Sequence, residues 1–128
     1  MTNPTDREFE QMLQDKGLNA PRITPDLVQA NIASEHYFTA FDGAAHTGEH
    51  SKWAGDWEVP RSIVALNLLT FCVLVLRNGF TVTGESACAS PENFDAEAGR
   101  IAARRNAENK IWPLMGYELK CRLSQEVK

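Results

Sequence analysis

The stretch of residues 70–83, TFCVLVLRNGFTVT, decides the fold. Its first half, residues 70–76, is apolar and rich in β-branched side chains, which is typical of a buried strand. Asn78-Gly79 follows, and residues 80–83 form a second run of this kind. Asn-Gly between two such runs is the strongest short-range signal for a β-hairpin, because both central residues of its tight turn need positive φ. We therefore expect an antiparallel hairpin over residues 70–83.

The segments before the hairpin change character twice. Residues 34–41, SEHYFTAF, alternate with the period of a strand and are expected to belong to the same sheet. Asp42-Gly43 is expected to turn the chain. Residues 43–62 are rich in Gly, Ala and His and show neither a helical nor a strand period, so this segment is predicted to be a loop.

A long helix is predicted after the hairpin, over residues 91–111. Ser90 as N-cap and Pro91 in the first turn favour a start there, and Pro113 is expected to kink or stop the helix. A second, short helix is expected over residues 117–123. One side of the long helix is rich in small residues, which lets another backbone approach closely. This side is expected to pack on the hairpin, with a subunit interface as the alternative for part of it; it consists of Ala96, Gly99, Ala103, Ala107 and Ile111.

These predictions combine into an α+β fold. A small antiparallel sheet, made of the hairpin 70–83 and the strand 34–41, is expected to pack against the long C-terminal helix 91–111 and the short terminal helix. Since 128 residues suit one domain, residues 25–128 are expected to form it. Residues 1–24 are polar and are expected to form an N-terminal arm that carries a short amphipathic helix.

Composition and charge exclude several classes of function. The net charge of -4 gives no general attraction to DNA, RNA or anionic lipid, so nucleic acid is not an expected partner. The three cysteines are widely spaced and form no CxxC pair, which argues against a disulfide framework and a zinc site. The first residues are polar and acidic, unlike a signal peptide, and the apolar stretch 63–76 is shorter than the roughly 20 residues that span a bilayer. We expect a cytoplasmic protein without a membrane partner.

Three arginines within six residues stand out in this acidic chain: Arg100, Arg104 and Arg105. Guanidinium groups supply planar, bidentate donors suited to phosphate, so the cluster is a candidate anion site. The alternative, which the pattern by itself favours, is a solvated face whose charges are compensated by Glu97 and Glu108. Both interpretations stay open at this point.

No arrangement of residues predicts catalysis or a metal site. His46 and His50 are four residues apart, but they lie in a Gly-rich segment with no helix to align them, so we expect no metal ligands there. No Ser/His/Asp or Cys/His arrangement is readable, and carboxylates surround Cys88 in the sequence. We expect a protein that is not an enzyme and that carries no cofactor.

Residues 78–95, NGFTVTGESACASPENFD, together with residues 110–117, KIWPLMGY, resemble a family of small tailed-phage proteins named for the products of gene 49 and gene 66 in two phages. The resemblance covers roughly residues 70–123. The family is similar to phage anti-defence proteins of the Thoeris-inhibiting kind, which sequester cyclic ADP-ribose-type signals of host immunity. This implies an α+β subunit that forms a homo-oligomer, a dimer or larger, and encloses a cyclic nucleotide signal without catalysis in the host cytoplasm.

For such a ligand, the chemistry and position of the side chains suggest a division of roles. The three arginines would face the phosphates, hydrogen bonds to ribose or base would come from polar groups near the start of the long helix, and aromatic rings would stack on the purine. The candidate ligand-binding residues are Arg100, Arg104, Arg105, Asn93, Ser86, Glu85, Phe80 and Tyr117. The alternative is a protein-binding inhibitor or adaptor, which would hold a host protein through its acidic surface and the Trp-containing residues 43–62.

Overall fold

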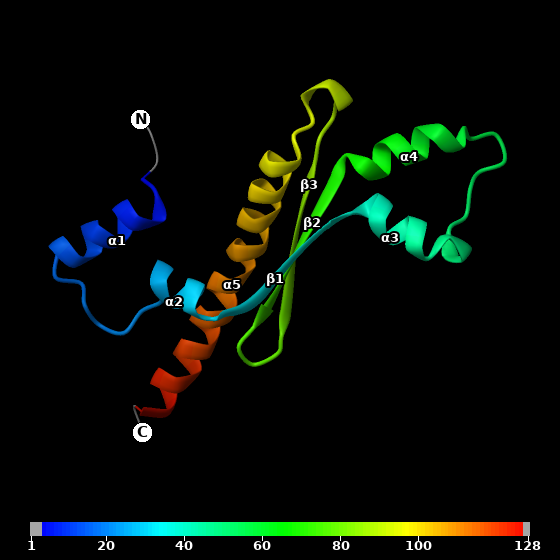
Figure 1. The fold of residues 1–128 in the computed structure, drawn as a ribbon. Helices are drawn as coiled ribbons and strands as arrows, with labels where there is room; N and C mark the ends of the chain where they lie inside the picture. The colour runs from blue at the N-terminus through cyan, green and yellow to red at the C-terminus, as the bar shows by residue number, and fades with distance from the viewer. Residues whose placement is uncertain (1–3, 127–128) are drawn as a thin grey trace.

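The computed structural model describes residues 4–126 and has an α+β fold. A three-stranded antiparallel sheet in the order β1-β2-β3 carries one long helix, α5, along one face (Figure 1). Two short 3₁₀ turns, Gly48–His50 and Pro91–Asn93, complete the chain. The elements are α1 (Asp6–Asp15), α2 (Pro25–Ala30), β1 (Ile32–Thr39), α3 (Ala40–His46), α4 (Val59–Asn67), β2 (Leu69–Leu76), β3 (Thr81–Ala87) and α5 (Ala96–Glu126).

The predicted hairpin is confirmed, although its turn differs from the expected one. β2 pairs with β3 in antiparallel register, with Val73 opposite Thr83. Gly79 has a φ of +88°, but Asn78 does not have positive φ. The amide of Leu76 donates to the carbonyl of Phe80, and the amide of Gly79 donates to the carbonyl of Leu76, each at 2.8 Å. The connection is therefore a three-residue loop that needs left-handed backbone only at its glycine, rather than a two-residue turn that needs it twice.

The predicted strand over residues 34–41 is β1, which lies two residues earlier than expected and pairs with β2. Asp42 does not turn the chain but occupies the third position of α3, where its side chain accepts a hydrogen bond from the amide of Thr39. The Thr39 side chain in turn accepts from the amide of Asp42 at 3.2 Å. This reciprocal capping box starts a helix in a segment that was expected to be a loop. Residues 43–62 thus contain most of α3, a 3₁₀ turn and the start of α4.

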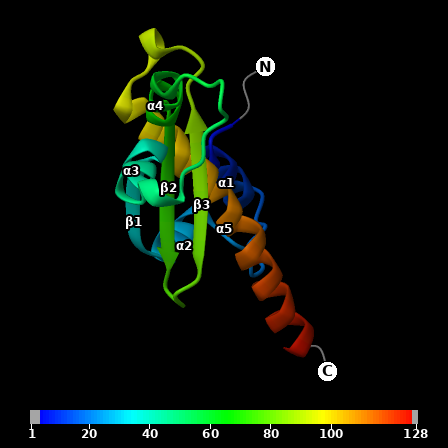
Figure 2. The same cartoon turned by 90° about the vertical axis from the view of Figure 1, so that its right-hand side faces the viewer.

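The core lies between α5 and the sheet, as the small residues on the helix predict. Ala103, Ala107 and Ile111 are completely buried, and they face Cys72 and Leu74 of β2, which are also completely buried. β1 and α2 close one side of this core (Figures 1 and 2), where Val28 is buried.

The long helix begins and ends later than expected. Ser90 makes no side-chain cap, and only the 3₁₀ turn follows it. Asp95 starts α5 instead, because its side chain accepts a hydrogen bond from the amide of Ala98 at 2.8 Å. Pro113 does not stop the helix, which continues to Glu126 and absorbs the short terminal helix that was expected separately. The last turns of α5 extend past the hairpin (Figure 2).

The N-terminal segment forms the short helix that the sequence predicts. Thr5 and Glu8 make a capping box at the start of α1, and Gly17, with a φ of +70°, follows its end. α1 packs on α2 away from the sheet (Figure 1). An ion pair between Glu10 and Arg22 connects α1 to the segment that precedes α2. Within residues 4–126, no helix has both the length and the apolar character needed to cross a membrane.

Candidate functional site

The arginine cluster divides according to the partners of each side chain. Arg104 points across the edge of the sheet, where its guanidinium donates to Glu35 of β1 at 3.3 Å and to Gln29 of α2 at 3.1 Å. It also forms an ion pair with Glu108, one turn later on α5. Two carboxylates and one amide therefore already occupy the donors of Arg104, which connects α5 to β1 and α2.

Tyr37 extends this polar network into the core. Its hydroxyl donates to Glu35 at 3.1 Å. Burial, and then this hydrogen bond to a carboxylate, raise the pKa of Tyr37 to about 12. Burial also raises the pKa of Cys72, which is completely buried beside Tyr37. Both groups thus stay protonated at neutral pH, and the Cys72 thiol is inert rather than nucleophilic.

Arg100 lies one helical turn before Arg104 and has a different environment. It lines a hollow of about 150 Å³ between the start of α5, the end of β1 and α3. In the part of the chain that the structure describes, no carboxylate oxygen lies within 4 Å of its guanidinium. The rest of the lining consists of three aromatic side chains, two threonines, an alanine and one carboxylate, which accepts a hydrogen bond from the amide of Thr39: Tyr37, Phe38, Phe94, Thr39, Thr70, Ala96 and Asp42. Of the three predicted arginines, Arg100, which is itself exposed to solvent, is the one that lines this hollow.

Arg105 is adjacent to Arg104 in the sequence but points about 100° further around α5. It is exposed to solvent. It lies outside the network of Glu35 and Glu108 and outside the hollow that Arg100 lines. The cluster seen in the sequence is therefore three arginines in three environments.

β3 continues past the predicted end of the hairpin at residue 83 and ends at Ala87. Because side chains alternate along a strand, Glu85 and Ser86 point to opposite faces of the sheet and cannot bind one ligand together. Glu85 is exposed, while its carbonyl accepts a hydrogen bond from the Asn106 side chain at 2.8 Å. Asn93 is exposed in the 3₁₀ turn before α5.

The two predicted stacking residues lie toward the other end of the sheet. Phe80 follows the hairpin turn, about 20 Å along β2 from Thr70 in the Arg100 hollow, by the rise of a strand. It lines a groove of about 510 Å³ between the hairpin and α5, together with Leu114. Tyr117 is 75% exposed. The eight candidate residues are therefore not brought together. The aromatic side chains that line the hollow with Arg100 are Tyr37, Phe38 and Phe94, which are not among the eight.

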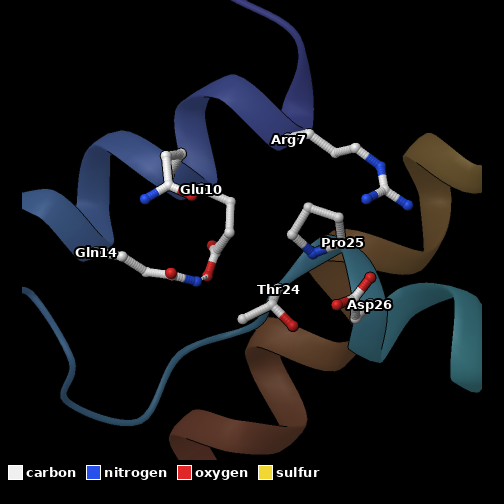
Figure 3. Close-up of a pocket in the computed structure, with 7 residues that line it drawn as sticks. Arg7, Glu10, Gln14, Thr24, Pro25 and Asp26 are labelled. Carbon is white, nitrogen blue, oxygen red and sulfur yellow. Dashed lines mark hydrogen bonds between the residues drawn. The ribbon is translucent and has the colours of Figure 1, made fainter.

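A separate polar hollow of about 330 Å³ lies between α1 and the start of α2. Figure 3 shows Glu10 and Gln14 projecting from α1 toward Thr24, with Arg7 above Asp26. The hydrogen bond from Arg22 lowers the pKa of Glu10. The mixed charges around this hollow largely compensate one another, so its electrostatics favour no particular ligand.

The histidines do not gather around a metal position. His36, His46 and His50 are all exposed, and His36 is hydrogen-bonded to Ser34 at 3.1 Å. Across residues 4–126, no group of three or more His, Cys, Asp or Glu side chains is placed to hold a metal ion.

Fold and site together define a small α+β protein with a three-stranded sheet, one long helix and a small arginine-lined hollow at the sheet edge. The model of the phage protein (N4 Gp49/phage Sf6 gene 66) family matches residues 23–123. The chain therefore belongs to this phage protein family. No curated protein and no solved structure matches the chain.

Proposed function

We propose that this protein acts by binding rather than by catalysis, and that it sequesters a cyclic nucleotide signal of host immunity in the cytoplasm of the infected cell. The ligand would be of the cyclic ADP-ribose type or a cyclic oligonucleotide. Membership of a phage family supports a role during infection. The observation that carries the proposal is the environment of Arg100. Its guanidinium has no ion-pair partner among the described residues, and it lines a hollow together with three aromatic rings.

The chemistry of this hollow suits one part of a nucleotide. A guanidinium can donate two parallel hydrogen bonds to a phosphate, and an aromatic face can stack on a base. Arg104 is left out of the site, because Glu35 and Glu108 already hold its guanidinium.

The size of the hollow limits what one chain can hold. Pockets that bury a drug-sized ligand measure about 300–1,000 Å³, whereas the Arg100 hollow measures about 150 Å³. One chain therefore has room for a phosphate and part of a base or ribose. Enclosing a complete cyclic nucleotide requires a second chain in a homo-oligomer.

Thermal unfolding in the presence of candidate signals tests this proposal. A ligand at a hundredfold excess over its Kd stabilises a protein by about 2.7 kcal/mol, which raises the Tm of a domain of this size by roughly 10 °C. We expect a shift of this kind with a cyclic ADP-ribose isomer or a cyclic oligonucleotide. Arg100→Ala should weaken binding by tenfold or more, because it removes a charge-assisted hydrogen bond. Arg122→Ala, which removes an exposed arginine near the far end of α5, is the matched control.

Two results would overturn the proposal. One is the absence of a thermal shift with every nucleotide signal tested. The other is a ligand whose affinity is the same for Arg100→Ala and for wild type. Ligand released by heat should also be recovered intact, because a hydrolysed product would indicate an enzyme.

A second candidate function is that of an inhibitor or adaptor that binds a host protein. Trp53 and Trp57 are 46% and 45% exposed, and the guanidinium of Arg61 lies 5.4 Å from the centre of the Trp57 ring. Trp and Arg are the residues most enriched in the energetic centres of protein interfaces. Recovery of one host protein with the wild type and with Arg100→Ala, but not with Trp53→Ala, would support this function and count against nucleotide binding.

A further inference from the structure

β3 lies at the edge of the sheet, and its outer side, called the free edge below, pairs with no strand. The hydrogen bond from the Leu76 amide to the Phe80 carbonyl fixes which backbone groups face outward, because hydrogen-bonded and non-hydrogen-bonded pairs alternate along an antiparallel ladder. Thr81 and Thr83 occupy non-hydrogen-bonded positions of this ladder. Their amide and carbonyl groups therefore point away from β2, toward the free edge.

One end of the free edge is closed, and the other end is open. The carbonyl of Glu85 also faces the edge, where it accepts a hydrogen bond from the Asn106 side chain at 2.8 Å. Among the described residues, none bonds to the amides or carbonyls of Thr81 and Thr83. Proteins commonly protect such edges with a proline, a lysine or a bulge. Residues 81–83 have none of these, whereas the strand at the opposite edge, β1, has an irregular register near its start.

A groove runs between the free edge and α5. Figure 2 shows α5 emerging from behind β3 and passing this edge. The groove is open, measures about 430 Å³ and is lined by Phe80, Thr81, Val82, Thr83, Lys110, Pro113 and Leu114. Its apolar side chains are in contact with solvent, since Phe80 is 56% and Leu114 41% exposed. Unpaired backbone groups on one wall and apolar side chains on the other suit an extended peptide.

The alternation of β3 determines which side chains of such a peptide would enter the groove. Val82 is buried in the core against α5, whereas Thr81 and Thr83 are exposed on the other face of the sheet. An added strand continues this alternation. A peptide residue opposite Val82 would therefore point toward α5, where Pro113 and Leu114 provide an apolar contact. The peptide residues two positions before and after it would point the same way.

Lys110 gives the groove a preference for charge. It is exposed on α5, and in the part of the chain that the structure describes no carboxylate oxygen lies within 4 Å of its ammonium group. A carboxylate two residues from the apolar side chain would lie on the same side of the peptide and can form a charge-assisted hydrogen bond with Lys110. The groove thus complements an extended segment in which Asp or Glu stands two residues from an apolar residue.

A second copy of this chain does not fit the free edge. Each copy carries α5 on the same face of its own β3, so pairing two β3 strands would place two long helices in one layer. Where α5 passes the free edge, it already occupies that layer (Figure 2). The occupant is therefore a strand with no helix packed behind it.

We propose that the free edge at residues 81–83 binds an extended peptide segment of another protein by strand addition, with an apolar side chain over Pro113 and Leu114 and a carboxylate at Lys110. Backbone hydrogen bonds to the two threonines provide the affinity, and the alternate side chains provide the selectivity. The Arg100 hollow lies toward the other end of the sheet, so it stays open while the edge is occupied. The inference does not rest on nucleotide binding.

A synthetic peptide, Thr-Asp-Thr-Leu-Thr-Asp-Thr with both ends blocked, is the probe. Its sequence is the same in both directions, so it suits a parallel and an antiparallel strand equally. Amide hydrogen exchange followed by NMR gives the readout. In the free protein, the amides of Thr81 and Thr83 should exchange quickly, while those of Val82 and Gly84, which face β2, should exchange slowly. Saturating peptide should slow exchange at Thr81 and Thr83 by about tenfold or more.

Two substitutions at one position test the backbone contact. Thr83→Pro removes an amide hydrogen that faces the free edge and none that bonds to β2, a position where strands tolerate proline. Thr83→Val changes the side chain and keeps the amide. Both variants should remain folded by circular dichroism. The affinity for the peptide should fall by about tenfold with Thr83→Pro and should stay within about twofold of wild type with Thr83→Val.

A charge exchange tests the side-chain contact independently of any change in the strand. Lys110→Glu should weaken binding of the peptide by about fivefold, the upper range for an exposed ion pair. The same variant should prefer a peptide in which both aspartates are replaced by lysine. Lys120→Glu is the matched control, because Lys120 is exposed on α5 outside the groove, and it should show neither effect.

Four results would overturn the inference. The first is unchanged exchange at Thr81 and Thr83 with millimolar peptide, and the second is equal affinity of Thr83→Pro and wild type. The third is an equal response of the Lys110 and Lys120 variants, which would remove the assigned carboxylate. The fourth is protection of both threonine amides in the free protein that increases with protein concentration, which would assign the edge to a second copy. Thermal shift by nucleotides is a separate readout, so neither proposal fails with the other.

Discussion

A Cβ atom placed on Gly84 would lie 2.2 Å from the carbonyl oxygen of Ala103, because β3 and α5 meet backbone to backbone at this point. The same atom would lie 2.3 Å from the amide nitrogen of Ala107. Ala103 and Ala107 are completely buried, so neither the strand nor the helix has a side chain that could move aside. β3 and α5 can therefore approach this closely only because position 84 has no side chain and positions 103 and 107 have only a methyl group.

Gly84→Ala should consequently be one of the most damaging small substitutions in this protein. Inserting a methyl group would force β3 and α5 apart along the core, and we expect a loss of about 3 kcal/mol in the free energy of unfolding, the upper end of the usual cost of overpacking. Gly43→Ala is the control, because nothing lies within 4 Å of the added atom and the residue is within α3. That control should gain about 0.5–1 kcal/mol. Urea unfolding of both variants checks the pair, and equal stabilities would contradict the close contact.

Arg104→Ala should lower stability without affecting a phosphate ligand at Arg100. The substitution leaves Glu35 and Glu108 without their cationic partner, and Glu108 is only 19% exposed. Because more than a quarter of the Arg104 side chain is in solvent, screening limits the expected loss to about 1 kcal/mol. Arg105→Ala removes the neighbouring, exposed arginine and should change stability by less than about 0.5 kcal/mol. Urea unfolding that gave the two variants equal stability would show that the network of Arg104 contributes nothing.

Tyr37 should make stability fall at high pH. Its pKa is raised to about 12 in the folded protein, from an ordinary value of about 10. The fold favours the neutral phenol, so the contribution of Tyr37 is fully present below pH 10 and is lost as the pH rises to about 12. This difference in pKa corresponds to a loss of roughly 3 kcal/mol in the free energy of unfolding.

The chain has two tyrosines, which makes this prediction directly measurable. In a Tyr117→Phe background, the remaining tyrosinate absorbance should titrate near pH 12. Urea unfolding of Tyr37→Phe should depend less on pH between 10 and 12 than that of the wild type. Titration of Tyr37 near its ordinary value would mean that the ring is open to water.

Local patterns predicted the hairpin and the small-residue face of α5, because each signal consists of residues close together in the sequence: Asn78-Gly79 between two apolar runs, and alanines at helical spacing. They failed where two local signals competed. Ser90-Pro91 has the residue types of a helix start, yet Phe94 is extended with a ψ of 129°, and the helix begins only after Asp95. The capping box of Thr39 and Asp42 predicts α3, whereas Asp42-Gly43 equally has the residue types of a turn.

The candidate site was harder to predict than the fold because its contacts are distant in the sequence. Glu108, four residues after Arg104, could be foreseen as its partner. Glu35, however, lies 69 residues before Arg104, so nothing near the arginines indicates the connection to β1. The rings around Arg100 come from β1 and from the segment before α5. The alternation of residues 34–41 could have placed Tyr37 on the helix side of the sheet, but not at a particular turn of that helix.

Pro113 provides the last prediction, since α5 continues through it. The ring removes one hydrogen bond within the helix and clashes with the carbonyl of Asn109, at a cost that reaches about 3 kcal/mol in helix interiors. Ile111 before it is completely buried and Met115 after it packs on the core, so tertiary contacts on both sides hold the helix together. Pro113→Ala should therefore stabilise the protein by about 1–3 kcal/mol, because Pro113 is exposed and no core contact is lost. Lys120→Ala on the same helix should change little, and urea unfolding compares the two. A destabilised Pro113→Ala would show instead that Met115 reaches the core only through the bend that the proline imposes.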